Sequence, residues 1–418
     1  MVVKTEVAIV GAGPYGLSLA AHLRSAGADF RVIGHPMEAW RNHMPEGMLL
    51  KSDGFASNLY DPQGEYPLSR HCRELGIAYD DKRTRVRLDT FVDYGLAFAR
   101  RFVPELTVAL VQSVRREGSG FELRLDDGSL VMARRIVVAV GVGRFKNIPE
   151  KLRRLGDQVS HSYDHRDLSV FTGRRIAVVG AGASAIDIAG LMRDHDADVE
   201  LICRADRLGF GGPRRENDPS LWESLRNPSS GIGPGWPSRL CTDATLLFYM
   251  GPAPLRLKIV EKHLGPFADF VMKEKIEGRV PVRNSCEIAD TALEGGRIRL
   301  TLRKRDGTTS GQSYDHVVAG TGYRVDINRL EFLDKSLRSE IACVKNTPIL
   351  STRFQSSVRG LFFVGPVAAN SFGPMMRFAY GAGFASRRVA GALKPRRSFI
   401  PFASRSLSIS KLRPRGSC

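Results

Sequence analysis

Two glycine-rich turns of similar spacing are the residues in this chain most clearly suited to chemistry. They read G-x-G-x-x-G and G-x-G-x-x-A, and their residues are Gly11, Gly13 and Gly16, then Gly180, Gly182 and Ala185. In such a turn the first glycine allows the bend, the second lets the backbone approach a pyrophosphate, and the third lets helix and strand pack closely. Two turns predict two dinucleotide sites. The alternative is a pair of glycine-rich turns in an α/β fold that binds no nucleotide.

The segments around the turns must position them. Each turn follows a short β-branched run, at residues 6–10 and 175–179, and precedes a helix of small residues. Each helix is followed by another apolar run, which is the opening of a βαβ unit. The sequence therefore predicts the α/β fold class, with two dinucleotide-binding Rossmann-like domains.

Further apolar runs predict how the two domains are connected. Buried strands are expected at residues 130–140, 314–319 and 360–365, with glycine turns at Gly141, Gly320 and Gly365. A helix is expected over residues 378–393, and residues 210–237, dense in Gly, Pro and Trp, are expected to form a loop excursion. We expect a discontinuous first domain, residues 1–170 and 311–393, with the second domain, residues 171–310, inserted in it.

Composition and charge limit the classes of function. The chain has 418 residues and a net charge of +18. The segment 394–418 contributes +7 of this charge, because it has seven basic residues and no acidic residue. We expect that segment to be a basic, disordered tail, and no nucleic-acid recognition motif accompanies the charge. The six cysteines are scattered without a C-x-x-C pair, and neither a leader nor a transmembrane run is visible. These features predict a cytoplasmic protein without dithiol chemistry.

The residues after the second βαβ unit bear on the choice of nucleotide. Arg204 and Arg207 stand where an acidic residue would bind the ribose of NAD, and arginine pairs instead with a 2′-phosphate. They favour NADPH, the alternative being two surface arginines on a basic protein. The matching position of the first unit holds Gly34 and His35, with no acidic residue.

Together these motifs resemble the class B flavin-dependent monooxygenases, which include FMO-type enzymes, Baeyer–Villiger monooxygenases and N-hydroxylases of amines and amino acids. The resemblance rests on residues 11–16, 180–185 and 319–323, with His161 and Gly365. It implies FAD at the first turn and NADPH at the second. The linker fingerprint of the family, F-x-G-x-x-x-H-x-x-x-[FYW], is matched only at His161, so no subgroup is assigned.

The resemblance also implies site residues. Trp40 would lie near the flavin ring, and Lys51 would stabilise negative charge on the reduced flavin. Asp61 would contact the nicotinamide and flavin N5 region, and Arg377 would add charge near the ring or meet an acidic substrate. The alternatives are a core tryptophan, an Asp-Pro turn and a helix-surface arginine. Further cofactor contacts are expected at Pro14, Ser52, Gly141, Ala183, Ser184, Gly320, Thr321, Gly322, Tyr323 and Gly365.

The predicted function follows from this set. We expect an FAD-dependent, NADPH-using monooxygenase that oxygenates a small organic substrate through a flavin C4a-hydroperoxide. N-hydroxylation, or oxygenation of another small nitrogen compound, is favoured because the linker fingerprint is incomplete. The partners would be a small-molecule substrate and dioxygen; no metal site is expected, and a homo-oligomer is left open. Two alternatives remain: an NAD(P)H-dependent flavin oxidoreductase without oxygen insertion, and a non-catalytic flavin-binding sensor or scaffold.

Overall fold

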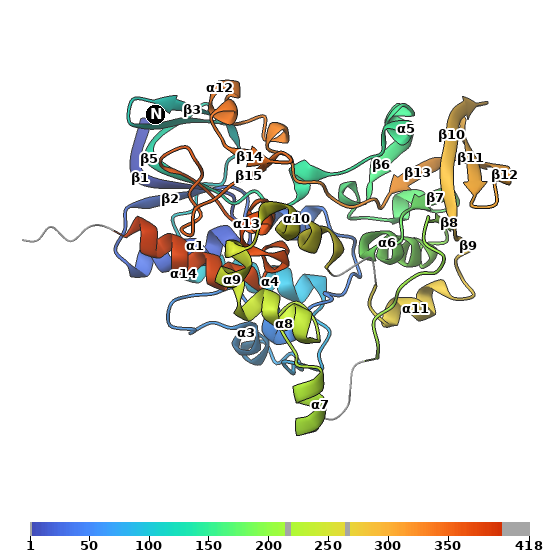
Figure 1. Cartoon of the computed structure of the whole chain (residues 1–418), viewed down its shortest axis with the longest axis horizontal. Coiled ribbons are helices and arrows are strands. Elements are labelled where there is room, and N and C mark those ends of the chain that lie inside the picture. Colours follow the sequence, from blue (N-terminus) through green and yellow to red (C-terminus); the bar gives the residue numbers. More distant parts are fainter. Residues whose placement is uncertain (1, 214–218, 264–267, 395–418) are drawn as a thin grey trace, which may run out of the picture.

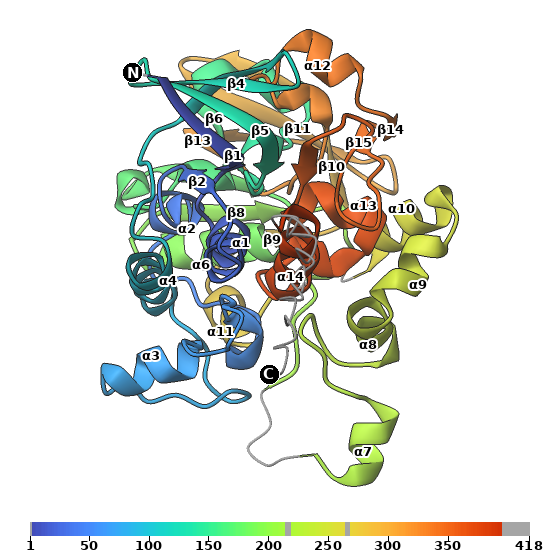
Figure 2. The ribbon, with the colours of Figure 1, turned by 90° about the vertical axis from the view of Figure 1, so that its left-hand side faces the viewer.

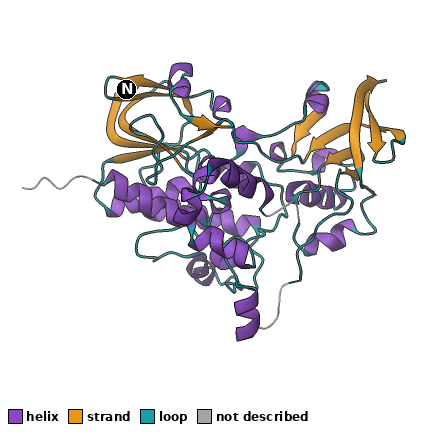
Figure 3. Cartoon of the chain, in the orientation of Figure 1, coloured by secondary structure: helices purple, strands orange, loops and turns teal. Residues whose placement is uncertain are grey.

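The computed structural model describes residues 2–213, 219–263 and 268–394. Its strands fall into two groups on opposite sides of the molecule, and helices lie between and below them (Figure 3). The predicted tail lies outside the described residues, apart from Lys394. No helix in the described ranges is long and apolar enough to cross a membrane.

The first sheet contains the first glycine turn. Its strand order is β2-β1-β5-β4-β3, and β16 pairs with residues 136–138 of β5, beyond the residues 130–133 that pair with β4. Strands β1, β2, β5 and β16 are mutually parallel where they pair, whereas β3, β4 and β5 form an antiparallel meander. The bounds are β1 (Val2–Val10), β2 (Phe30–Ile33), β3 (Val111–Glu117), β4 (Gly120–Leu125), β5 (Leu130–Val138) and β16 (Leu361–Phe363).

Two helices distant in sequence cover this sheet together. Helix α1 (Pro14–Ser25) begins directly after the glycine turn, and it packs against α14 (Gly381–Leu393), near the end of the described chain. The two lie side by side in both views (Figures 1 and 2). Helix α4 (Leu88–Phe102) also packs against α1. The chain thus returns to its first unit after building the second.

The second sheet contains the second glycine turn and is parallel throughout, in the order β6-β13-β7-β8-β9. Its strands are β6 (Val159–His161), β7 (Arg175–Val179), β8 (Asp198–Ile202), β9 (Val282–Arg283) and β13 (His316–Ala319), and α6 (Ala183–Arg193) follows β7. Strands β6 and β13 therefore extend this unit beyond residues 171–310, the range expected for it. Beside it stands an antiparallel sheet of β10 (Cys286–Glu294), β11 (Arg297–Lys304) and β12 (Thr309–Tyr314).

The remaining elements are short. They are α2 (Glu38–Asn42), α3 (Leu68–Glu74), α5 (Glu150–Arg153), α9 (Thr245–Met250), α10 (Ala253–Lys262), α11 (Val271–Ile276), α12 (Lys335–Ser339), α13 (Ala369–Phe372), β14 (Cys343–Val344) and β15 (Thr347–Pro348). The expected loop excursion at 210–237 instead contains α7 (Leu221–Arg226) and the start of α8 (Trp236–Asp243). Ser220 caps α7 in a capping box with Glu223, a local signal that the glycine and proline content obscured. The predicted α/β fold class with Rossmann-like units is confirmed.

Candidate functional site

A cavity of about 1970 Å³ lies between the two units and is lined by both glycine turns. Its volume exceeds the roughly 300–1,000 Å³ typical of a pocket for one small ligand, as two dinucleotides require. Seven lysine and arginine residues line it against four acidic residues, an excess that suits polyanionic ligands. Among the described residues, no group of three or more histidine, cysteine or acidic side chains is arranged to hold a metal ion.

The first glycine turn has the geometry expected of a pyrophosphate cradle. Gly11 has a φ of +114°, and a Cβ there would lie 2.4 Å from the carbonyl oxygen of Ala139. A Cβ at Gly13 would meet no atom within 4 Å, so its backbone faces open cavity. A Cβ at Gly16 would lie 1.9 Å from the carbonyl oxygen of Gly11. Gly16 does not line the cavity; it allows α1 to pack against the turn.

The second turn repeats this geometry. Gly180 has a φ of +147°, and a Cβ there would lie 2.3 Å from the carbonyl oxygen of Gly320. Gly182 precedes α6, whose first residues, Ala183 and Ser184, line the cavity. Helix N-termini of this kind attract anions through free N–H groups and the helix dipole. The residues present therefore fit one dinucleotide at each end of the cavity.

Most residues predicted to contact a cofactor line this cavity. On the side of the first unit they are Gly11, Gly13, Pro14, Trp40, Lys51, Ser52, Gly141 and Gly365. On the side of the second unit they are Gly180, Gly182, Ala183, Ser184, Arg204, Gly320, Thr321, Gly322 and Tyr323. Gly16 and Arg207 do not line it. The structure brings these positions together, and their contacts with a bound cofactor remain predictions.

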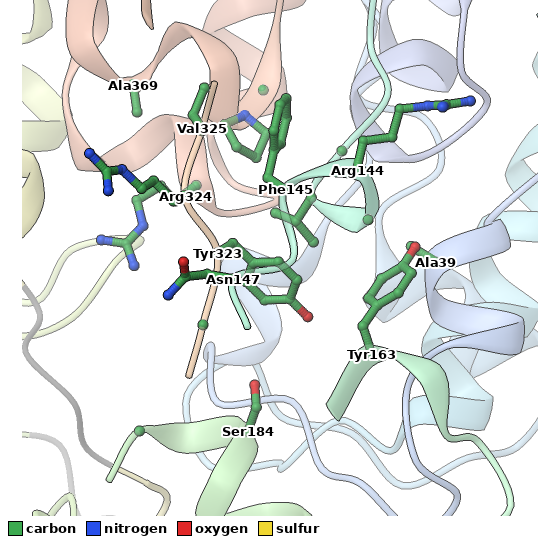
Figure 4. Close-up of a pocket in the computed structure, with 18 of the residues that line it drawn as sticks. Ala39, Arg144, Phe145, Asn147, Tyr163, Ser184, Tyr323, Arg324, Val325 and Ala369 are labelled. Atoms are coloured by element: carbon green, nitrogen blue, oxygen red, sulfur yellow. The ribbon is translucent and has the colours of Figure 1, made fainter. Parts of the chain in front are cut away.

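The predicted turn at residues 319–323 is fixed by hydrogen bonds to the segment after β5. The Thr321 hydroxyl donates to the carbonyl oxygen of Asn147, and the Asn147 N–H donates to the carbonyl oxygen of Gly322 at 3.0 Å. Beside this turn, Asn147, Tyr323 and Tyr163 stand around the middle of the cavity, and Ser184 of α6 lies below them (Figure 4). The turn thus belongs to the wall that both units share.

An aromatic cluster in the middle of the cavity was not predicted. The rings of Tyr163 and Tyr323 lie 6.1 Å apart at 87°, and His43 stacks on Tyr163 with ring centroids 4.2 Å apart. Burial raises the pKa of Tyr163 to about 12, and it also raises the pKa of Tyr323. Both phenols therefore stay protonated at neutral pH and can donate hydrogen bonds. In the sequence, the one feature that could have pointed to Tyr163 is its position two residues after His161, the residue that matches the linker fingerprint.

Both ring nitrogens of His161 contact backbone groups. Its Nδ1 accepts the N–H of Tyr163 at 3.1 Å, so its Nε2 carries the proton and donates to the carbonyl oxygen of Gly322 at 2.9 Å. The ring is fully buried, and this burial lowers its pKa. His161 therefore joins the interdomain linker to the turn that carries Tyr323, and it holds a neutral ring.

Trp40 and Lys51 reach the cavity from the segment after β2. The Trp40 ring packs edge-on against Phe91, with centroids 4.7 Å apart, while the side chain lines the cavity. Trp40 thus combines the core role and the cavity position that were posed as alternatives. Lys51 Nζ lies 3.0 Å from the Asp187 carboxylate of α6 and also lines the cavity.

The two predicted catalytic residues differ in position. Asp61 does not line the cavity: its carboxylate accepts the backbone N–H groups of Gln63, Glu65 and Tyr66 at 2.9–3.2 Å. The structure thus places Asp61 in the Asp-Pro turn that was its alternative interpretation. Arg377 lines the cavity, and its guanidinium donates to the carbonyl oxygen of Val260 at 3.2 Å.

The two arginines proposed to bind NADPH also differ in their position relative to the cavity. Arg204 follows β8 and lines the cavity. Both arginines are exposed, but the cavity wall does not include Arg207. At the matching position of the first unit, His35 lines the cavity in place of an acidic residue. Of the two arginines, Arg204 is the one that lines the cavity, and its contact with a 2′-phosphate remains a prediction.

Comparisons with known proteins agree with this arrangement. The chain is 26% identical to the indole-3-pyruvate monooxygenase YUCCA1 of Oryza sativa over 206 residues, 47% of each chain. It is 25% identical to a ferredoxin–NADP reductase of Gluconacetobacter diazotrophicus, covering 75% of this chain and 91% of that one. The matched region thus spans about half the length of the rice relative. The structure resembles that of the ornithine N-hydroxylase of Kutzneria sp. 744, with a TM-score of 0.76, 17% identity, and coverage of 94% of this chain and 100% of that one.

The likeness to the N-hydroxylase shows a shared fold and confirms, at that level, the resemblance to class B flavin-dependent monooxygenases. A family match goes further. The family described as pyridine nucleotide-disulphide oxidoreductase matches residues 8–224, about half of the chain. Its members bind FAD and NAD(P), so the predicted cofactors are confirmed. The chain therefore belongs to the pyridine nucleotide-disulphide oxidoreductase family.

Proposed function

We propose that the protein is an NADPH-dependent FAD monooxygenase that oxygenates a nitrogen atom of a small amine-containing substrate. The observation that carries the proposal is the single cavity, to which both glycine turns contribute their backbone. When bound there, NADPH supplies hydride and reduced FAD supplies the activation of dioxygen. Every other requirement, including orientation, exclusion of water and hydrogen bonding, falls to residues of the chain.

Residues at the middle of the cavity can serve the reacting groups. Tyr163 and Tyr323 present protonated phenols on the wall between the turns, and Trp40 offers an aromatic face on the first unit. Hydrogen-bond donors in a water-poor site stabilise developing negative charge. This wall suits a reaction in which a reactive oxygen species must be protected from water.

A third part of the cavity wall supports an amine-containing substrate. It combines the Glu261 carboxylate, the Arg377 guanidinium and the amide of Asn370, which is 3% exposed and donates to Thr347 at 3.1 Å. A carboxylate recognises an ammonium group, and an arginine recognises a carboxylate. The N-hydroxylase whose fold this chain shares is named for ornithine, which carries both groups.

The experiment that tests the proposal measures how NADPH oxidation is coupled to product. FAD-loaded protein is mixed with NADPH in air and with a panel of primary amines and basic amino acids, and NADPH loss, hydrogen peroxide and hydroxylamine are quantified. We expect one class of amine to lower the peroxide formed per NADPH and to yield hydroxylamine in matching amount. Peroxide equal to NADPH consumed with every amine would overturn the proposal.

A second candidate is electron transfer from NADPH through FAD to a carrier, without oxygen insertion. The match to a ferredoxin–NADP reductase over 91% of that protein supports it. The same mixture with ferredoxin and cytochrome c separates the two candidates. Rapid reduction of cytochrome c that depends on ferredoxin, without hydroxylamine, would favour the reductase.

A further inference from the structure

Asp187 is a buried carboxylate for which the cavity chemistry has no role so far. It lies in α6, just after the residues of the helix that line the nucleotide cavity, and is 5% exposed. Its Oδ2 lies 3.0 Å from Lys51 Nζ. Lys51 is its ion-pair partner in the part of the chain that the structure describes.

The pair joins the two units. Lys51 comes from the segment of the first unit that also brings Trp40 to the cavity, and Leu50 anchors that segment by donating its N–H to the carbonyl oxygen of Val86 at 2.8 Å. Asp187 belongs to the helix whose N-terminus faces the second dinucleotide position. The ion pair therefore ties the flavin-side segment to the nucleotide helix at the wall that both ligands share.

A small second cavity lies beside the Asp187 carboxylate. Its volume is about 20 Å³, enough for one water molecule, and Ser162, Ser184 and Tyr323 are among its lining residues. The Ser162 hydroxyl is buried and has no hydrogen-bond partner among the described residues. Ser184 and Tyr323 also line the main cavity, so Asp187 lies one side chain behind its wall.

The surroundings of Asp187 disfavour the charged form of its carboxylate. Burial raises the pKa of Asp187 in spite of Lys51, and the nearby Asp269 adds to the rise, although Asp269 is itself paired with Arg85 at 2.8 Å. His43 lines the small cavity on another side. Two apolar side chains of similar volume would usually serve packing as well as or better than a buried ion pair. A charged pair kept here therefore calls for a role beyond packing.

We propose that Asp187 is a positioning residue that holds the Lys51 ammonium at the cavity wall, and that this pair couples binding of the nicotinamide nucleotide to the flavin-side segment. The inference rests on the proposed function only in that the cavity takes both nucleotides. With Asp187 in place, the ammonium is paired with the fifth residue of α6, one turn behind the N-terminus where a pyrophosphate would bring negative charge. Without Asp187 the Lys51 side chain is free to turn into the cavity.

The experiment measures the Kd of NADP⁺ for FAD-loaded protein by titration calorimetry, together with Tm, in three variants. D187N removes the negative charge that pairs with Lys51 and keeps one acceptor oxygen. The double variant K51M/D187L replaces both charges with apolar side chains. D194N is the matched control, because Asp194 caps the far end of the same helix and pairs with Lys275 and Arg279 away from the cavity.

We expect D187N to weaken NADP⁺ binding roughly tenfold and to lower Tm. The double variant should recover the Tm of the native protein and still bind NADP⁺ roughly tenfold more weakly. D194N should bind NADP⁺ with native affinity. Native affinity in D187N, or recovery of both Tm and affinity in the double variant, would overturn the inference and leave a structural pair. Oxygenation is not measured, so failure of the proposed function would appear separately, as absence of hydroxylamine.

Discussion

Gly320 and Ala185 meet so closely that a Cβ on Gly320 would lie 2.5 Å from the Cβ of Ala185. Ala185 occupies the third position of the second turn, where the first turn has Gly16. The residue that faces the first glycine of each turn differs as well. Gly11 faces the carbonyl oxygen of an alanine, Ala139, whereas Gly180 faces the carbonyl oxygen of a glycine, Gly320. The methyl group that the second turn carries on its helix is thus accommodated by a glycine directly after the facing strand, β13.

The first prediction tests this exchange. G320A should lower the free energy of unfolding by about 1–3 kcal/mol, because the added methyl group overfills a packed contact. The double variant A185G/G320A should recover only part of that loss, since the Cβ of residue 185 is removed but the new methyl group still lies 2.7 Å from the Cα of that residue. Urea unfolding of the three proteins measures the effect. Equal destabilisation in the single and double variants would show that Gly320 is needed for another reason.

The second prediction concerns nucleotide choice. R204A should raise KM for NADPH about tenfold or more, because a charge-assisted contact with the 2′-phosphate is worth about 1.5–3 kcal/mol. Its KM for NADH should hardly change. R207A is the matched control, since Arg207 is exposed like Arg204 but does not line the cavity. If the two variants lose NADPH discrimination equally, the assignment to Arg204 is wrong.

The third prediction concerns Asp61. D61A should lower the free energy of unfolding by about 2 kcal/mol or more, because three backbone N–H groups lose a charged acceptor. D61N keeps one acceptor oxygen and should fall between D61A and the native protein. The rate of flavin reduction per folded molecule should be unchanged in both variants, as stopped-flow absorbance would show. A large loss of that rate in a folded D61N protein would instead restore a catalytic role.

The fourth prediction is a pH dependence of stability. His316, which is 8% exposed, contacts the Ser160 hydroxyl at 2.8 Å, and burial first, then His165 and Arg174, lower its pKa to about 4. An unfolded histidine, with a pKa near 6.5, takes up its proton first, so this residue's contribution is complete above about pH 6.5 and is lost as the pH falls toward 4. The loss by pH 4 should be about 3 kcal/mol.

The control for this prediction is H316Q, which can still hydrogen-bond to Ser160 but cannot be protonated. Urea unfolding at pH 7.5 and 4.5 should show a smaller difference between the two pH values in H316Q than in the native protein, by about 2 kcal/mol. Equal differences in the two proteins would assign the pH dependence to other groups.

The sequence predicted the parts of the site that depend on local backbone geometry. Gly11 and Gly180 are required by a turn with positive φ, and that requirement is visible in the spacing alone. Arg204 was predicted for a similar reason, because its place after β8 follows from the βαβ pattern. The sequence did not separate Arg207 from Arg204, since five residues beyond the end of β8 a side chain can point toward the cavity or away from it.

The remaining features depend on contacts between distant segments. Tyr163 and Tyr323 are 160 residues apart along the chain and meet only because β6 and β13 pair in the second sheet. Apolar runs such as 314–319 do not reveal which sheet they join, so β13 was expected in the first unit. The ion pair of Lys51 with Asp187 likewise needs the docking of two units, which no local pattern encodes.

The most direct test of the central claim is the fate of isotopically labelled dioxygen. FAD-loaded protein would be incubated with NADPH, ¹⁸O₂ and the amine that best suppresses peroxide formation, and the product would be analysed by mass spectrometry. The account predicts one ¹⁸O atom in a hydroxylamine product, in amounts that match the NADPH not recovered as peroxide. Unlabelled or unmodified amine, with all NADPH electrons recovered in peroxide or in an added carrier, would contradict it.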